Sequence, residues 1–536
     1  MTGHKVVFPD GHKGVVVAHR PPIAFVYNGV ETMGLQDGQV SVLKEMARIS
    51  VRDEKNVVRW DGSPVDDTAT DNAVDMFRIS SGRPIFAPIP QVKDIALINN
   101  PMLTGNTMID TLAPIGQGQN MLLIADDVSA ARGMICDFIS TQQRRISGEH
   151  EKTKFVYAAI DDSVDVTKRL KDAGLLEKIH LVRSSLAEED KVEEAARAAE
   201  ATAMAATACA IAETYTIEQG MNTVVIIDSL DQHKKFWDAT TRVLVDIFGM
   251  ESVVKSDREG GASSEMRGFF SSIVQRSAQY KASRGGGSLT LLLLMHLPSA
   301  SGDEDTTFSE KDFEGGSEKV RARIELLTKK GIPLTAATLR KIDIPIPSAS
   351  EGQRRLVLQH IDDLISMSDG QIWLDETLRE AGQNPPIDPQ RSITRIGIGA
   401  DTQSRADAPA LRRIAEGLRL DLSQAANMDG AEVTSSSKKQ IRRRSALLLA
   451  MHQEVGRGGR TLSESCTALL AASSGYLDNA VDSGKLAGTE SGQELLDSLL
   501  EHVQKHAPDA LATIDQTLDL SEEIKRELMN SIKSFF

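Results

Sequence analysis

The stretch "NMLLIADDVSAARGM", residues 120–134, has the pattern of a buried strand that feeds a helix. Its apolar run, Met121 to Ile124, ends in a short polar turn, and small residues suited to a helix follow. Phosphate-binding loops occupy this position, because the N-terminus of the helix attracts an anion. The turn itself, however, contains neither glycine nor lysine. It is either an unrelated strand–turn–helix or a nucleotide site that has lost its chemistry.

The composition is that of a globular protein. The 536 residues are enough for two to four domains, and 40% of them are hydrophobic. A net charge of −15 argues against a nucleic-acid partner. The three cysteines form no CxxC pair, which indicates a reducing compartment. No apolar stretch approaches the roughly 18 residues that span a bilayer, so we expect membrane association only through a complex.

The chain divides into three regions. Residues 1–90 hold short β-rich runs between Gly, Pro and Asp, which predict a small β-domain. In residues 91–404, near-continuous apolar runs alternate with helical segments, as in a parallel sheet covered on both faces. Residues 299–353 form a polar insert within this region. In residues 405–536, apolar residues recur every three or four positions, which predicts a helical bundle.

A second motif, "TVVIIDSLDQH", lies about a hundred residues after the opening stretch. Its apolar run ends in Asp228. An acidic residue at the end of a buried strand beside a phosphate loop usually holds hydrated magnesium. The run alone occurs in many α/β folds, but its order and spacing after the opening stretch favour a nucleotide-binding frame.

Six segments in order resemble the alpha subunit of F-type ATP synthases, the non-catalytic partner in an alternating alpha–beta hexamer. The segments are "TGNTMIDTLAPIGQGQ", "VVIIDSL", "SRGGGSLTLL", "LISMSDGQIWLDETL", "GQNPPIDPQRSITRIG" and "SGYLDNAVDSGKL". The resemblance implies an α/β fold: a RecA-like parallel-sheet nucleotide-binding core, an N-terminal β-barrel, here truncated, and a C-terminal helical domain. These parts agree with the three regions predicted from composition.

The resemblance also identifies the opening stretch as a degenerate phosphate loop. Family members carry a glycine-bounded loop that ends in Gly-Lys-Thr. Ala125 stands at the first glycine, Ala130 at the second, Ala131 at the lysine, and Arg132 at the hydroxyl residue that binds magnesium. Side chains at 125 and 130 hinder the close backbone approach that glycine permits.

The charges in this loop also disfavour phosphate binding. Asp126 matches an aspartate common in the family, but Asp127 adds a carboxylate beside the phosphate position, worth roughly 1 kcal/mol or more of repulsion. Arg132 restores one positive charge but cannot coordinate magnesium. Asp161 and Asp162 replace family residues at the mouth of the site. We therefore expect weak or absent binding of Mg-ATP or Mg-ADP, and no bound metal.

The opposite side of the site resembles the family more closely. In the family, the arginine of the segment that reads "SITRIG" here reaches into the catalytic site of the neighbouring beta subunit as an arginine finger. That residue is Arg395. Ser366 and Gly370, in "ISMSDGQ", match positions that line the partner's phosphate site. The alternative for Arg395 is an ion pair within its own fold.

The sequence therefore predicts a non-catalytic alpha-type subunit of a divergent, proton-translocating ATP synthase, without intrinsic activity. Its partners would be beta subunits in the ring and a gamma subunit in the bore. The alternative is an alpha-like assembly factor or regulator of the synthase head, favoured by the missing N-terminal helix and the long insert. The expected location is the matrix side of the mitochondrial inner membrane or the stromal side of the thylakoid, although no targeting segment is visible.

Overall fold

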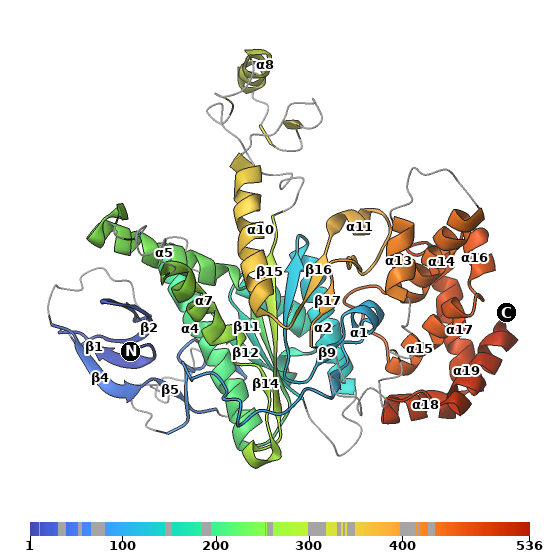
Figure 1. Cartoon of the computed structure of the whole chain (residues 1–536), viewed down its shortest axis with the longest axis horizontal. Helices are drawn as coiled ribbons and strands as arrows, with labels where there is room; N and C mark the ends of the chain where they lie inside the picture. The colour runs from blue at the N-terminus through green and yellow to red at the C-terminus, as the bar shows by residue number, and fades with distance from the viewer. Residues whose placement is uncertain are drawn as a thin grey trace.

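The computed structural model places an antiparallel sheet, a central α/β unit and a group of C-terminal helices along one elongated molecule (Figure 1). It describes residues 1–9, 11–29, 39–51, 56–65, 81–144, 153–184, 194–251, 253, 261–298, 313, 318–329, 334–335, 338–339, 349–396, 411, 414, 418–426 and 435–536.

The N-terminal sheet has four antiparallel strands in the order β3-β2-β1-β4. They are β1 (His4–Val7), β2 (Lys13–Arg20), β3 (Ile23–Tyr27) and β4 (Ser41–Met46). Strand β2 is the most buried of them, and five of its eight residues form a continuous buried run. Two small two-stranded sheets follow, β5 (Arg48–Ile49) with β7 (Arg83–Pro84), and β8 (Pro101–Met102) with β9 (Ile115–Gly116).

The central sheet has nine strands, eight of them in the order β17-β16-β10-β15-β13-β11-β12-β6, and a ninth, β14, beside β15. The strands are β6 (Val57–Val58), β10 (Asn120–Ala125), β11 (Lys154–Ala159), β12 (His180–Arg183), β13 (Thr223–Asp228), β14 (Ala278–Gln279), β15 (Ser288–His296), β16 (Gly370–Leu374) and β17 (Ile393–Thr394). Pairing is parallel from β16 to β6, and β14 and β17 are antiparallel. The apolar runs of the sequence thus form a parallel sheet, as predicted.

Helices cover both faces of this sheet. They are α1 (Thr107–Leu112), α2 (Val128–Arg144) and α3 (Ser163–Asp172) on one face, and α4 (Glu194–Glu213), α5 (Asp231–Phe248), α7 (Gly261–Val274) and α10 (Ala349–Met367) on the other. Along β10, Met121 and Leu123 join the first cluster, whereas Leu122 and Ile124 join the second. Because successive side chains of a strand point to opposite faces, a strand buried on both sides must be apolar throughout.

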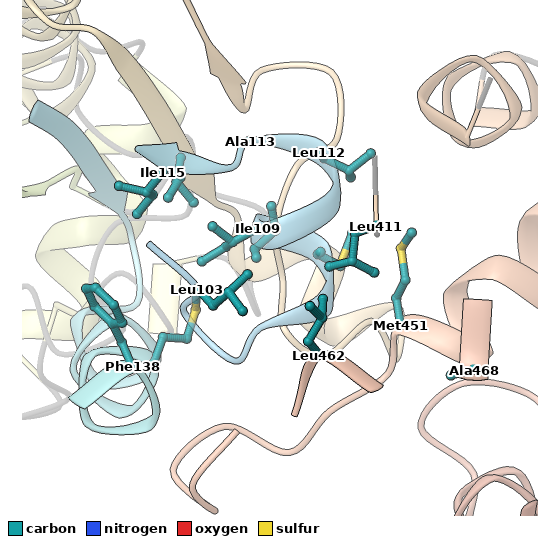
Figure 2. Close-up of a cluster of buried hydrophobic side chains, with 14 of the residues drawn as sticks. Leu103, Ile109, Leu112, Ala113, Ile115, Phe138, Leu411, Met451, Leu462 and Ala468 are labelled. Atoms are coloured by element: carbon teal, nitrogen blue, oxygen red, sulfur yellow. The ribbon is translucent and has the colours of Figure 1, made fainter. Parts of the chain in front are cut away.

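The C-terminal helices extend the first of these two cores. They are α13 (Leu418–Ala426), α14 (Ser435–Met451), α15 (Leu462–Ser473), α16 (Asp478–Asp482), α17 (Glu490–His506), α18 (Pro508–Thr517) and α19 (Glu522–Phe535). Figure 2 shows the junction, where Ile109 and Leu112 of α1 lie among Leu411, Met451 and Leu462. One continuous apolar cluster therefore joins the sheet to the C-terminal helices.

The polar insert leaves the carboxyl end of β15 and leads into α10. Its described part includes α8 (Glu318–Lys329), which lies beyond one end of α10 and away from the sheet (Figure 1). Four buried residues form a separate small cluster there, namely Phe313, Ile324, Leu334 and Leu339. Much of the expected insert, 299–353, lies outside the described residues.

The predicted α/β fold class is confirmed, with an antiparallel N-terminal sheet, a mostly parallel central sheet and C-terminal helices. The expected domain limits remain predictions, and β6 pairs with the central sheet although it precedes residue 90. In the part of the chain that the structure describes, no helix is long and apolar enough to cross a membrane.

The loop between α14 and α15 is fixed to the central unit by Asp137 of α2. Its carboxylate accepts hydrogen bonds from the backbone N–H groups of Gly456 (2.7 Å) and Gly458 (2.5 Å). We expect Asp137→Ala to lower the free energy of unfolding by about 1–2 kcal/mol, since both donors lose a charged acceptor. Urea denaturation measures this loss. Glu501→Ala, on the exposed side of α17, is the control and should cost less than about 0.5 kcal/mol; equal losses would contradict the assignment.

Candidate functional site

The connection between β10 and α2 is much shorter than a phosphate loop. Strand β10 ends at Ala125 and α2 begins at Val128, so Asp126 and Asp127 alone join them. Ala130, Ala131 and Arg132 lie in the first turns of the helix rather than in a loop. Alanine favours the helix, and no glycine interrupts the segment. The backbone therefore continues as a helix and does not form an anion-binding loop.

Asp127 occupies the end of α2 where a phosphate would bind. Its Oδ1 accepts a hydrogen bond of 3.1 Å from the backbone N–H of Ala130. A carboxylate at this position caps the helix and satisfies the positive end of its dipole. Its other oxygen pairs with Arg379 of α11 (Glu376–Glu380). The Asp127 carboxylate thus occupies the N-terminus of α2, where an external anion would otherwise bind.

Asp126 is also engaged within the chain. Its Oδ1 accepts a 2.9 Å hydrogen bond from the backbone N–H of Glu376, at the start of α11. Burial raises the pKa of this carboxyl, and the Glu376 N–H opposes that shift. The two aspartates of the turn therefore hold α11 against β10, one at its first residue and the other through Arg379.

Arg132 and Asp228 form the centre of the site. The Arg132 Nε lies 2.7 Å from Asp228 Oδ2, and its Nη2 lies 3.2 Å from Oδ1, so the pair is bidentate. The Tyr157 hydroxyl donates a further hydrogen bond of 2.7 Å to Oδ2. The side chains of Arg132 and Asp228 are 8% and 1% exposed. The carboxylate expected to hold magnesium is therefore saturated by a guanidinium and a phenol.

Further contacts fix the rest of the Arg132 guanidinium. Nη2 donates to the Asp161 carbonyl (2.9 Å), and Nη1 lies 3.4 Å from Asp165 and 3.6 Å from Asp162. Burial alone would lower the pKa of Arg132, but the hydrogen bonds and charge of Asp228 outweigh it and raise that pKa. Arg132 stays a cation, and its charge is directed at Asp228 rather than at an open phosphate position.

Burial also has the largest effect on the pKa values of the two partners of Arg132, Asp228 and Tyr157. It raises the pKa of the Asp228 carboxyl, against the hydrogen bonds from Arg132 and Tyr157. The Tyr157 hydroxyl, fully buried beside that carboxyl, has its pKa raised well above 10, so it stays protonated and remains a donor. The three side chains together form a closed network in which each polar tip has a partner.

The surroundings of this network are acidic. Six carboxylates lie at or beside the turn with three arginines, in the set Asp126, Asp127, Asp161, Asp162, Asp165, Asp228, Arg132, Arg169 and Arg379. An excess of negative charge repels a nucleoside triphosphate, and the repulsion grows where water is excluded. Among the described residues, no cluster of three or more His, Cys, Asp or Glu could hold a metal ion.

Ser366, Gly370 and Arg395 lie together at the other end of the sheet. Gln371 of β16 pairs with Leu122, and Leu374 pairs with Ala125, so Gly370 lies at the level where β10 begins. The Arg395 N–H donates to the Asp369 carbonyl (2.8 Å), and its Nη1 donates to the Ile365 carbonyl (2.5 Å) at the end of α10.

These three residues differ in exposure. Ser366 and Arg395 are exposed, whereas Gly370 is buried. A Cβ on Gly370 would lie 2.7 Å from both the Ile393 carbonyl oxygen and Met121 Sδ. Gly370 therefore allows β16 and β17 to approach closely, and only Ser366 and Arg395 present side chains at the surface.

Two contacts of the site were missed by the sequence reasoning. Tyr157 lies in an apolar run and was not predicted as a site residue. A tyrosine in a buried strand usually requires a hydrogen-bond partner for its hydroxyl, and this is the signal that could have indicated its role. Arg379 lies 252 residues from Asp127, and nothing local in the sequence links them.

The Arg132–Asp228 pair predicts a strong asymmetry between single and double substitutions. We expect Arg132→Met or Asp228→Leu alone to cost about 3–5 kcal/mol of unfolding free energy, because each leaves a buried charge unpaired. The double variant should cost no more than either single one. A double-mutant cycle by urea denaturation measures this, and additive losses, or single losses below about 1 kcal/mol, would rule out a tightly coupled pair.

Comparison with known proteins agrees with the arrangement of strands and helices around this site. The family described as "ATP synthase alpha/beta family, nucleotide-binding domain" matches residues 105–305, which contain β10, α2 and β13. The chain is 25% identical to an ATP synthase subunit alpha of Orientia tsutsugamushi (strain Ikeda), over 100% of the chain and 89% of the relative.

Two other relatives carry the same name. The one from Rickettsia bellii is 23% identical over 100% of the chain and 89% of its own length. The one from Acidithiobacillus ferridurans is 23% identical over 83% of the chain and 73% of its own length. The matched nucleotide-binding domain and these relatives thus make the chain similar to the alpha subunits of ATP synthases, at about a quarter identity.

Proposed function

We propose that the chain is a non-catalytic alpha-type subunit of a divergent ATP synthase whose own nucleotide site is closed by intramolecular contacts. The observation that carries this proposal is the bidentate Arg132–Asp228 pair. A magnesium ion at Asp228 would need the lone pairs that Arg132 and Tyr157 already occupy. A triphosphate at α2 would need the helix end that Asp127 caps.

Opening this site for a nucleotide would be costly. Arg132 would have to leave Asp228, which would strand a carboxylate that is 1% exposed. Asp127 would have to release both the end of α2 and Arg379. Mg-ATP would then enter a region with more carboxylates than guanidinium groups. These energetic costs oppose nucleotide binding and support weak or absent binding at this chain's own site.

The exposed Arg395 supports a role at a neighbouring subunit. In the part of the chain that the structure describes, its side-chain hydrogen bonds all come from Nη1, to the Ile365 and Ser368 carbonyls. No described residue accepts a hydrogen bond from Nε or Nη2, and we propose that these donors serve a second chain. A planar, permanently charged guanidinium is suited to developing charge on a transferred phosphoryl group. We infer that Arg395 contributes in trans to a beta subunit, with Ser366 beside it.

The assembly that follows is an alternating hexamer with beta subunits around a gamma subunit, on an energy-transducing membrane with a proton gradient. The chain would contribute to ATP synthesis as a structural and trans-acting subunit. The small core of the insert, around Ile324 and Leu339, favours a second candidate, an assembly factor or regulator of the head. Native electrophoresis of the source membrane distinguishes them: stoichiometric co-migration with beta supports the subunit, and sub-stoichiometric, transient association supports the factor.

The closed site predicts that the purified chain does not bind Mg-ATP tightly. In isothermal titration calorimetry, we expect no binding in the submicromolar range, because Asp228 and the end of α2 already have their partners. Arg132→Thr, which frees Asp228 and restores a hydroxyl, should bind Mg-ATP more tightly than the unchanged chain. Submicromolar affinity of the unchanged chain would overturn the proposal.

The interface role predicts a rate effect in the assembled complex. Arg395→Ala should lower ATP turnover at the beta sites by about 10³–10⁵-fold, which is the value of an arginine finger. The matched control is Arg391→Ala, an exposed arginine of the same segment whose guanidinium stacks on Trp373. Steady-state ATPase assays on complexes of verified subunit content measure both. Unchanged turnover with Arg395→Ala would remove the finger from the mechanism.

A further inference from the structure

A cavity lies between the N-terminal sheet and the helices of the central unit. Its volume is about 510 Å³, and residues of β2, α5 and α7 make up just over half of its lining. The lining is largely apolar and aromatic and includes Val17, Phe86, Trp237, Phe269 and Ile273. This volume and this lining are those of sites that hold small organic molecules.

One wall of the cavity carries a buried cation with an unused donor. Arg276 is 1% exposed, and its Nε lies 2.7 Å from Glu213. Its Nη1 donates to the Ile85 carbonyl (2.9 Å) and the Ala206 carbonyl (3.1 Å). Its Nη2 is buried and has no hydrogen-bond partner among the described residues. An unpaired buried donor on a charged group is costly, so an acceptor at this position would stabilise the fold.

The charge around Arg276 is also unbalanced. Glu213 pairs not only with Arg276 but also with Arg83, whose Nη2 lies 3.2 Å away. Among the described residues, two guanidinium groups therefore share one carboxylate, which leaves one positive charge in excess there. Elsewhere in the lining, Arg20 pairs with Glu265 (3.4 Å) and stacks over Trp237, so its charge has a partner. The excess lies at the Arg276 wall.

A second buried polar side chain lines the same cavity. His233 of α5 is 2% exposed, and neither ring nitrogen has a hydrogen-bond partner among the described residues. Burial lowers the pKa of His233 to about 3, with a smaller contribution from His360. The imidazole is therefore neutral near pH 7, and one of its nitrogens is a donor that an anion can use.

We propose that this cavity binds a hydrophobic monocarboxylate, with the carboxylate at Arg276 Nη2 and the apolar body among Trp237, Phe269 and Phe86. The excess positive charge selects an anion, and the apolar walls select a molecule with little further polarity. The site shares no residue with the β10–α2 turn or with Arg395, so it does not depend on the proposed function.

The test is a titration of the full chain with naphthalene-2-carboxylate, by isothermal titration calorimetry. The matched probe is naphthalene-2-carboxamide, which has the same shape and no charge. We expect the carboxylate to bind at least about tenfold more tightly than the amide. Equal affinities, or no binding of the carboxylate, would overturn the proposal.

Two variants separate a specific site from general hydrophobic binding. Gly268 of α7 borders the cavity, and a Cβ there meets no atom within 4 Å, so Gly268→Leu partly fills the space. It should weaken carboxylate binding about tenfold or more, whereas Arg267→Leu, at the neighbouring exposed position outside the lining, should not. Equal effects of the two leucines would contradict the site.

Arg83→Met tests the charge without altering the lining. It leaves Glu213 paired with Arg276 alone and removes the excess positive charge. The preference for carboxylate over amide should then shrink severalfold, with the affinity for the amide unchanged. A preference that survives this change would show that Arg276 does not select the anion. Circular dichroism and urea denaturation confirm that each variant is folded.

Discussion

The ion pair between Arg132 and Asp228 is the interaction on which the candidate site depends. It joins the first turns of α2 to the end of β13, and Tyr157 of β11 adds a third contact. Three neighbouring parts of the sheet edge are thereby tied together without a ligand. In related sites a magnesium ion supplies positive charge at such a carboxylate. Here a guanidinium that is part of the chain supplies it, and the helix end beside it is capped by Asp127.

Most of the fold could be predicted because burial on both faces leaves a clear pattern in the sequence. The near-continuous apolar runs of residues 91–404, which we expected to form a parallel sheet, lie in or overlap strands that include β11, β12, β13 and β15. The pairing of β6 with β12 could not be predicted, because two residues carry no periodicity. The place of Gly370 could not be predicted either, since its close contacts come from β10 and β17 rather than from neighbours in sequence.

The site could be predicted in its parts but not in its arrangement. The lack of glycine and lysine between residues 125 and 132, and the pair Asp126 and Asp127, were visible in the opening stretch. We predicted that Arg132 cannot coordinate magnesium, but the sequence does not say that its side chain turns onto Asp228, 96 residues away. The same limit applies to Arg379 and Asp127. Contacts between distant residues depend on the fold of the sheet, which brings the strand ends to one edge.

The capped end of α2 has a consequence for how the chain responds to its surroundings. A bound nucleotide stabilises a protein by an amount that rises with its concentration, so such a protein is tied to the energy state of the cell. Asp127 is covalently part of the chain. The stabilisation from its contact with Ala130 N–H therefore does not depend on the concentration of a ligand. Under the proposed loss of nucleotide binding, the order of this sheet edge would be the same when ATP is abundant and when it is scarce. The edge would then act as a fixed support, and any response to metabolism would come from another surface.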